Sequence, residues 1–180
     1  YDNTGVDAGE FIEVAGPAGV DLASYSLVLY NGTGGAMYTT TPLSGIIPNQ
    51  MNGFGTMSFA YPVNGIQNGS PDGIALVKNG TTVLQFLSYE GVFVAADGPA
   101  MGMSSTDVIV QEVGSEPLGL SLGVIGIGTM YSNFFWFGPS AQSPGALNIG
   151  QSIPVPPGSG PVITSSDITI AGACPQEYTI

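Results

Sequence analysis

The sequence predicts an all-β protein folded as an antiparallel β-sandwich, and three observations support this prediction. Gly and Pro supply 28 and 14 of the 180 residues, so few segments keep an uninterrupted helical pattern. Short runs rich in Val, Ile, Phe, Tyr and Thr recur along the chain, each bounded by residues typical of turns. The dipeptide Asn-Gly, which tolerates the positive φ of a tight hairpin turn, occurs five times.

The predicted strands follow one another at short intervals. In the first, EFIEVA at 10–15, acidic and apolar residues alternate, which predicts a strand with Glu10 and Glu13 facing outward. The second, LASYSLVLY at 22–30, carries two leucines on one face. The remaining predicted strands are Met57–Ala60, Gly73–Lys78, Thr82–Tyr89, Val108–Glu112, Ser121–Ile127 and Asn133–Phe137.

The clearest hairpin is KNGT at 78–81, which separates GIALV from TVLQFL. Both central residues accept positive φ, as a type I′ turn requires. A second hairpin is predicted within Leu118–Gly138, an apolar stretch long enough to suggest a membrane span. Gly and Ser interrupt this stretch every second or third residue and no basic residue flanks it. Two strands and a turn explain it better, so we expect no membrane span.

The second strand of that hairpin is unusually aromatic. Alternation places Phe135 and Phe137 on one face, and Phe134 and Trp136 on the other, with Tyr131 just before them. Both faces are therefore apolar. We expect one of them to contact something beyond its own sandwich, with the C-terminal tail or a neighbouring copy as the first candidate and a glycan as the second.

Charge and residue chemistry exclude several classes of function. The chain has 13 acidic residues, one Lys, no Arg and no His, and its net charge of −12 opposes binding to nucleic acid. With no His, one Cys and one Lys, it lacks the usual side chains of nucleophilic, general-base and zinc chemistry. The pairs Glu10/Glu13 and Glu112/Glu116 match glycoside hydrolysis by residue type only. We therefore expect a protein that is not an enzyme and requires no cofactor.

One cluster of oxygen-bearing side chains is a candidate calcium site. Asp2, Asn3, Asp7 and Glu10 lie close together in a segment that also contains Gly5. Hard oxygen ligands on such a loop suit Ca²⁺, but their spacing differs from that of an EF-hand. The alternative is that Asp2 and Asp7 cap turns and that Glu13 is simply solvated. The sequence alone favours the turn-capping interpretation and leaves calcium as an optional ligand.

The C-terminal thirty residues differ from the rest. A Pro- and Gly-rich segment, Ile153–Pro161, predicts an extended linker. Beyond it, Val162–Ala171 (VITSSDITIA) predicts one more strand, and Cys174 follows without a second Cys to pair with. We therefore divide the chain into a sandwich at 1–151 and a tail at 152–180. The tail residues expected to contact a partner are Val162, Ile163, Ile168 and Ile170.

The opening segment, YDNTGVDAGEFIEVAGPAGVDLASYSLVLYNG, resembles the lamin tail domain of secreted bacterial proteins. The resemblance continues in order through NGFGTMSF, GIQNGSPDGIALV, VLQFLSYEG, DGPAMGMSSTD and Trp136 with SPGALNIGQ, and it covers 1–151. It implies an immunoglobulin-like β-sandwich without catalytic activity, a module often found beside extracellular nuclease or phosphatase domains or in surface proteins.

One departure from that family concerns the first strand. Its members usually carry an apolar strand just before the YDN motif, whereas this sequence begins at Tyr1. A sandwich without that strand exposes an unpaired edge. The tail strand Val162–Ala171 can fill the vacancy in its own subunit or in the next one, and head-to-tail repetition of such donation builds a filament.

These observations together predict a structural or interaction module at the cell surface or outside the cell. The first residue is Tyr rather than Met, which suggests a removed leader or a piece of a longer precursor, and the low charge suits a secreted protein. We expect its partners to be copies of itself in a filament or surface assembly. The alternatives are an accessory domain of a secreted nuclease or phosphatase, and a carbohydrate-binding module that uses the aromatic residues at 131–137.

Overall fold

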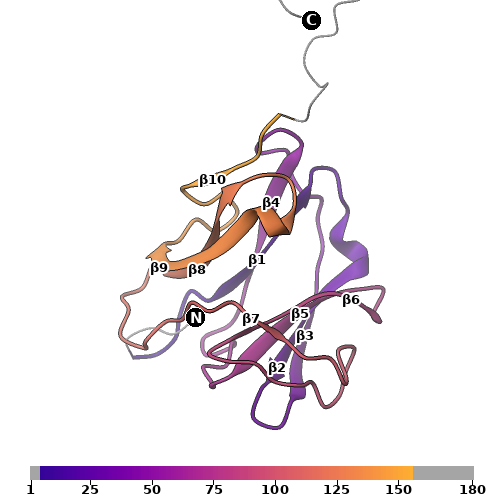
Figure 1. The fold of residues 1–180 in the computed structure, drawn as a ribbon, viewed down its shortest axis with the longest axis vertical. Coiled ribbons are helices and arrows are strands. Elements are labelled where there is room, and N and C mark those ends of the chain that lie inside the picture. The colour runs from indigo at the N-terminus through magenta and orange to yellow at the C-terminus, as the bar shows by residue number, and fades with distance from the viewer. Residues whose placement is uncertain (1–4, 156–180) are drawn as a thin grey trace, which may run out of the picture.

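The computed structural model describes residues 5–155, and the regular elements in that range are ten strands and two single-turn 3₁₀ helices (Figure 1). The all-β prediction is confirmed. The strands form a five-stranded sheet, a two-stranded sheet and a three-stranded sheet, and most neighbouring strands are antiparallel. The tail strand predicted at Val162–Ala171, and Cys174, lie outside the described residues.

The five-stranded sheet forms one layer, in the order β3-β2-β5-β6-β7. Strand β7 pairs parallel with β6, and the other pairs are antiparallel. The 3₁₀ turn Leu22–Ser24 leads into β2. The strand bounds are β2 Tyr25–Asn31, β3 Ala36–Pro42, β5 Asp72–Lys78, β6 Thr82–Tyr89 and β7 Thr106–Asp107.

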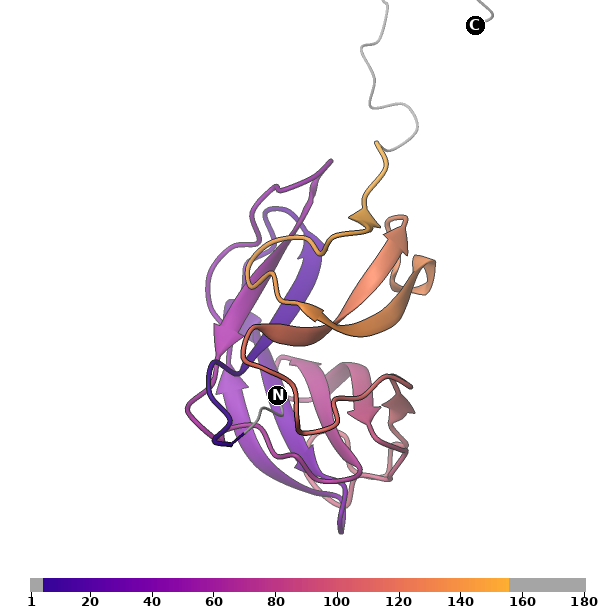
Figure 2. The same cartoon turned by 90° about the vertical axis from the view of Figure 1, so that its left-hand side faces the viewer.

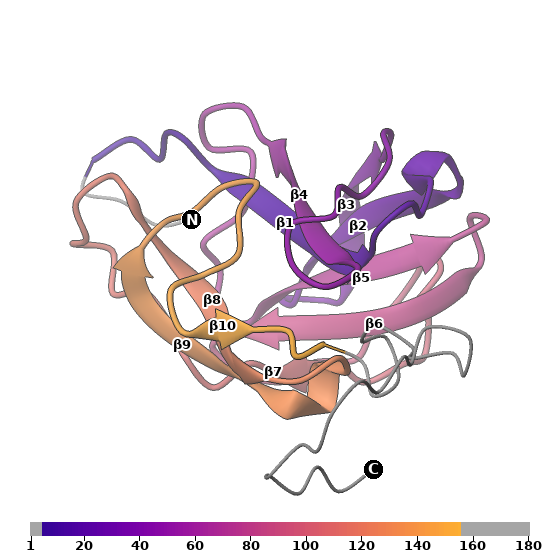
Figure 3. The ribbon, with the colours of Figure 1, turned by 90° about the horizontal axis from the view of Figure 1, so that it is seen from above.

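The second layer consists of two separate sheets (Figures 2 and 3). In one sheet, β1 (Phe11–Pro17) pairs antiparallel with β4 (Phe54–Ala60). In the other, β8 (Leu120–Ile127) pairs antiparallel with β9 (Phe134–Ala141) and, at its last two residues, parallel with β10 (Gln151–Ser152). A 3₁₀ turn at Tyr131–Asn133 connects β8 and β9. The sheet order gives β1 and β8 no pairing with each other.

Strand β2 is buried on both faces, and so carries two hydrophobic cores. Leu27 and Leu29 belong to the core between the layers, which also includes Val14, Tyr89 and Val108. Val28 and Tyr30 face the opposite side of the five-stranded sheet. There they pack against a second cluster that the loop after β6 closes over: Ala75, Val77, Phe86, Phe93, Ala95 and Ala100.

Local sequence signals identify the turns correctly. At the predicted hairpin, Asn79 and Gly80 have φ of 53° and 73°, and the Thr81 N–H donates to the Lys78 carbonyl at 3.3 Å. The apolar stretch Leu118–Gly138 folds as β8, a turn and β9, as the sequence predicts. Within residues 5–155, no helix has the length and apolarity needed to cross a membrane.

Two predictions about strands are wrong. Val108–Glu112 is not a strand, because Ile109 has a φ of +71° and its N–H donates to the Asp107 side chain, which turns the chain after β7. Strand β3 was not predicted. It is an edge strand with a largely exposed, Thr-rich sequence, and so lacks the apolar alternation that marks its neighbours.

The double burial of β2 makes its leucines sensitive to truncation. Leu29 is completely buried, so we expect Leu29→Ala to lower the free energy of unfolding by about 2–5 kcal/mol through lost burial and a residual cavity. Leu84→Ala on β6 is the matched control, because Leu84 is 52% exposed and its loss should change stability by about 0.5 kcal/mol or less. Urea denaturation followed by circular dichroism measures both. Equal effects would contradict the buried position of Leu29.

Candidate functional site

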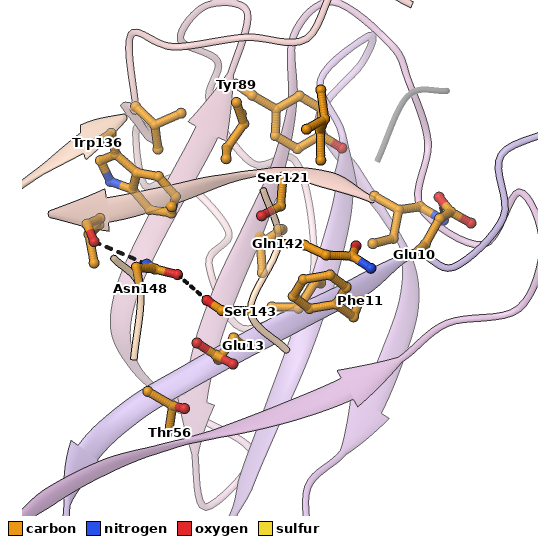
Figure 4. Close-up of a pocket in the computed structure, with 18 of the residues that line it drawn as sticks. Glu10, Phe11, Glu13, Thr56, Tyr89, Ser121, Trp136, Gln142, Ser143 and Asn148 are labelled. Carbon is orange, nitrogen blue, oxygen red and sulfur yellow. Dashed lines mark hydrogen bonds between the residues drawn. The ribbon is translucent and has the colours of Figure 1, made fainter. Parts of the chain in front are cut away.

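A cavity of about 370 Å³ lies between β1 and the first half of β8 (Figure 4). We call it the inter-sheet cleft. Side chains from the five-stranded sheet and adjacent loops form its floor, and the segment after β9 lies along its outer side. The principal floor residues are Ile66, Ile74, Leu87, Tyr89 and Val108, and the polar residues of the outer segment are Gln142, Ser143 and Asn148.

One side of the cleft is an unpaired edge of β1. The Tyr61 N–H donates to the Glu10 carbonyl and the Ala18 N–H donates to the Gly53 carbonyl, so the even-numbered residues of this strand point their backbone groups at β4. Backbone groups alternate in direction along a strand. Phe11, Glu13 and Ala15 therefore point their N–H and C=O groups away from β4, and β4 is the one strand with which β1 pairs in the described part of the chain.

The other side is the unpaired edge of β8. The Gln142 N–H donates to the Gly119 carbonyl, whereas the Gly126 N–H donates to Gly150 on the β10 side. The even-numbered residues Leu120 and Leu122 therefore direct their backbone groups away from β9 and toward the cleft. Farther along this edge, a side chain substitutes for a strand, since the Asn148 amide donates to the Val124 carbonyl at 3.0 Å.

The two edges run in the same direction and end at the same end of the cleft. Strand β10 pairs with the last residues of β8. Directly after it, the Ile153 carbonyl accepts a hydrogen bond of 2.7 Å from the Asn52 side chain, next to the start of β4, which pairs with the end of β1. Asn148 and β10 therefore close the cleft at this end, where the described part of the chain also finishes.

The core beside the cleft is covered unevenly, since the floor residues Ile66, Tyr89 and Val108 are buried. On the inner face of the five-stranded sheet, Ile74 and Leu87 remain only partly buried. On the outer face of the same two strands, Ala75 and Val77 are fully buried and Phe86 is nearly so. No residue of β8 is fully buried, although it alternates with an apolar inward face. In the described part of the chain, the layer over the inner face therefore has no strand between β1 and β8.

Glu13 attaches the outer segment of the cleft to β1. Its carboxylate accepts a 2.6 Å hydrogen bond from the Gly145 N–H, and Gln50 donates to the Gly145 carbonyl at 2.6 Å. Within the segment, the Ser143 hydroxyl donates to the Asn148 side chain at 2.7 Å (Figure 4). Burial raises the pKa of the Glu13 carboxyl, and the hydrogen bond from Gly145 opposes that rise.

Glu10 does not face outward as predicted, because it is 3% exposed. Its two carboxylate oxygens accept hydrogen bonds from the Gly65 and Ile66 N–H groups, at 2.7 and 3.1 Å. This pairing with backbone donors explains how a carboxylate is retained inside the fold. Burial is the main cause that raises the pKa of Glu10, the two N–H donors oppose it, and the nearby Asp7 carboxylate adds to the rise.

The calcium candidate is only partly described. Asp2 and Asn3 lie outside the described residues, while Asp7 is buried and accepts a 2.5 Å hydrogen bond from the Asn68 amide. Asp7 and Glu10 therefore both fasten the segment around 64–68. No group of three or more His, Cys, Asp or Glu side chains in 5–155 is arranged to hold a metal. Calcium binding stays a prediction.

In neither of the two candidate glycosidase pairs, Glu10/Glu13 and Glu112/Glu116, do the two carboxylates share an environment. Residues 10 and 13 are three positions apart on an extended chain, which directs their side chains to opposite faces. Glu10 holds the 65–66 backbone and Glu13 holds Gly145. Glu112 is buried, whereas Glu116 lies at the surface and accepts from the Val113 N–H.

The aromatic strand has the predicted alternation. Phe135 and Phe137 are 62% and 43% exposed on the outer face of β9. Trp136 lines the cleft and packs against the core, and its indole N–H donates to the Tyr131 hydroxyl at 2.8 Å. The other residues expected to contact a partner, Val162, Ile163, Ile168 and Ile170, lie outside the described residues.

Comparison of the chain with family models, curated proteins and solved structures found no match. The resemblance to lamin tail domains therefore stays a prediction. What sequence reasoning missed is the cleft, because its two edges come from β1 and β8, which lie far apart in the sequence.

Three carboxyls that are buried or half-buried predict how stability depends on pH. Burial raises the pKa of Glu10, Glu13 and Asp72 in the folded protein above their ordinary values of 4.5, 4.5 and 3.8. The folded chain then binds more protons than the unfolded chain between the ordinary and raised values. The free energy of unfolding should therefore increase as the pH falls from 7 through this window, and level off below the ordinary values.

Urea denaturation of the full chain at pH 7, 6 and 5 measures this dependence, and Glu10→Gln should flatten it. The control is Glu116→Gln, because the hydrogen bond from the Val113 N–H lowers the pKa of this surface carboxyl, the opposite direction. Relief of charge repulsion also favours folding at lower pH, and the Glu10→Gln comparison separates that general effect from the buried carboxyl. Stability that rises with pH would contradict the prediction.

Proposed function

We propose that the protein is a non-catalytic structural module whose copies join by strand exchange into an extracellular filament or surface assembly. The observation that supports this proposal most directly is the inter-sheet cleft. It has an apolar floor and is bounded by two strand edges, β1 and β8, whose backbone groups point toward each other without a ladder between them.

Such an arrangement favours the addition of an extended segment. Unpaired strand edges present a row of N–H and C=O groups that readily pair with another chain. Strand addition at a sheet edge obtains affinity from main-chain hydrogen bonds and specificity from alternate side chains. A strand inserted here would join the β1–β4 and β8–β9 sheets into one continuous layer. It would also cover the partly buried Ile74 and Leu87.

The described part of the chain ends beside Asn148 and β10, at the closed end of the cleft. The segment that follows can therefore supply a strand to its own cleft or to that of another copy. Donation from each copy to the next is a head-to-tail contact, which generates an open filament when the rotation does not close. The exposed Phe135 and Phe137 on the outer face of β9 supply further apolar surface for packing between copies.

The net charge of −12 sets the conditions for such assembly. Copies with 13 acidic residues and a single Lys repel one another at low ionic strength. Salt screens this repulsion over distances of about 10 Å at 0.1 M. Assembly driven by strand pairing and apolar burial should therefore be stronger at moderate ionic strength than at low ionic strength.

A second candidate function is carbohydrate binding, which the outer face of β9 favours. Exposed aromatic rings can stack on sugar rings, and Phe135 and Phe137 present two of them side by side on one strand face. Trp136, in contrast, points into the cleft and is held by Tyr131. The third candidate, an accessory domain of a secreted nuclease or phosphatase, depends on the lamin tail resemblance alone.

The assembly proposal predicts that oligomer size depends on the tail. We expect the full chain to form large assemblies at 0.15 M salt, and deletion of Gly160–Ile180 to reduce them to single chains. Light scattering and negative-stain imaging measure this. The control deletion removes only Gly172–Ile180, beyond the candidate strand, and should leave assembly intact. Single chains for the undeleted protein under these conditions would overturn the proposal.

Carbohydrate binding predicts retardation of the protein in a gel that contains a polysaccharide. Phe135→Ala combined with Phe137→Ala should abolish this retardation, because both exposed rings are lost. Val92→Ala is the control, since Val92 is also exposed but belongs to a different part of the surface. Unretarded migration of the unmodified protein across a panel of polysaccharides would remove this candidate.

A further inference from the structure

We infer that Val162–Ala171 is the segment that the inter-sheet cleft accepts, inserted antiparallel to both β1 and β8 with Ile168 and Ile170 facing the core. This inference rests on the proposed function and deepens it, because it names the donor segment, its direction and its core-facing residues. It concerns how the cleft is filled, whether the donor belongs to the same copy or to another.

The length of the two free edges sets the length of the donor. On β1 the free edge extends over Phe11–Ala15, and on β8 it extends over Leu120–Val124. Each edge offers alternate residues to a new strand, and the Val124 carbonyl is already taken by Asn148. The cleft can therefore pair with only a short donor strand. Within the tail, the DITIA sequence at 167–171 is as long as each free edge.

The two faces of the cleft match the two faces of this segment. Ile168 and Ile170 are two positions apart and share one face of an extended strand, whereas Asp167 and Thr169 lie on the other. The floor of the cleft is apolar, and the segment along its outer side is polar. A strand with its isoleucines toward the floor would cover the incompletely buried inner face of the five-stranded sheet. Its Asp and Thr would face Gln142 and Ser143.

The common direction of the two edges determines how the donor runs. Because β1 and β8 end at the same end of the cleft, a strand that opposes one opposes both. Antiparallel ladders would then form on its two sides, and antiparallel pairing is slightly more stable per residue than parallel pairing. Its outer neighbours β4 and β9 are already antiparallel to β1 and β8. Strand directions would alternate in the order β4-β1-donor-β8-β9, and the two-residue β10 would remain parallel to β8 beyond the donor.

Residue-resolved hydrogen exchange on the full chain tests this inference. We expect the free-edge amides of Phe11, Glu13 and Leu122 to exchange as slowly as the β4-facing amides of Ile12 and Val14. In a full-length variant with Ile168→Asp and Ile170→Asp, the free-edge amides should exchange at least tenfold faster. The β4-facing amides should stay slow, and this shows that the variant is still folded.

The matched control places the same two charges on the opposite face of the segment, as Ser165→Asp with Thr169→Asp. It should leave the free-edge amides slow. Fast exchange at these amides in the unmodified chain would overturn the inference. So would protection that survives in the Ile168→Asp and Ile170→Asp variant, because the cleft would then be filled by another segment or by a small molecule.

The outcomes also separate the inference from the proposed function. Assemblies whose free-edge amides exchange fast would support assembly and overturn the assignment of Val162–Ala171 to the cleft. Single chains whose free-edge amides are protected, and released by the Ile168→Asp and Ile170→Asp variant, would support the assignment. They would overturn assembly between copies.

Discussion

A five-stranded sheet can bury its inner face only if a second layer covers it, and in this protein that layer is divided between β1 and β8. Main-chain hydrogen bonding normally joins the strands of a layer, and here it stops at two facing edges. The consequence is visible in burial. Ile74 and Leu87 are only partly covered on the inner face, while Val77 and Phe86 are buried on the outer face, where Phe93 of the loop after β6 packs against Phe86. The candidate site is thus a gap in the backbone pairing of the fold, and strand insertion is the physical event that would complete it.

The few charges of the chain have structural tasks around this gap. Glu10, Glu13 and Asp72 each accept a hydrogen bond from a backbone N–H group distant in the sequence, and Asp72 accepts a second one from the nearby Gly69. These carboxylates fix the segments that border the cleft and the adjoining turn. Burial raises the pKa of each of these carboxyls. A chain with 13 acidic residues and one Lys therefore uses its carboxylates as acceptors for loop backbone, where their burial costs stability at neutral pH.

The structural proposal and its rivals use different surfaces of one hairpin. The edge of β8 faces the cleft, whereas the outer face of β9 presents Phe135 and Phe137. Strand exchange depends on the first surface and carbohydrate binding on the second. Trp136 belongs to the cleft side, where it contacts the core and hydrogen-bonds to Tyr131. Because the surfaces are separate, the two functions respond to different substitutions.

The sequence alone determined the features that depend on neighbouring residues. The all-β class, the turn at Asn79-Gly80, and the β8–β9 hairpin with its alternating aromatics all follow from local backbone preference and period-two alternation. Strand β3 was missed because its position at the sheet edge does not require apolar alternation. The turn at Ile109 was missed because a single hydrogen bond, from the Ile109 N–H to the Asp107 side chain, ends the strand there. The burial of Glu10, and the cleft itself, depended on tertiary structure. Glu10 is retained inside because the 65–66 backbone meets it, and the cleft exists because β1 and β8 approach from distant parts of the chain without pairing. No local sequence pattern shows that the backbone edges of β1 and β8 face each other unpaired, because this arrangement exists only once both strands are folded into place.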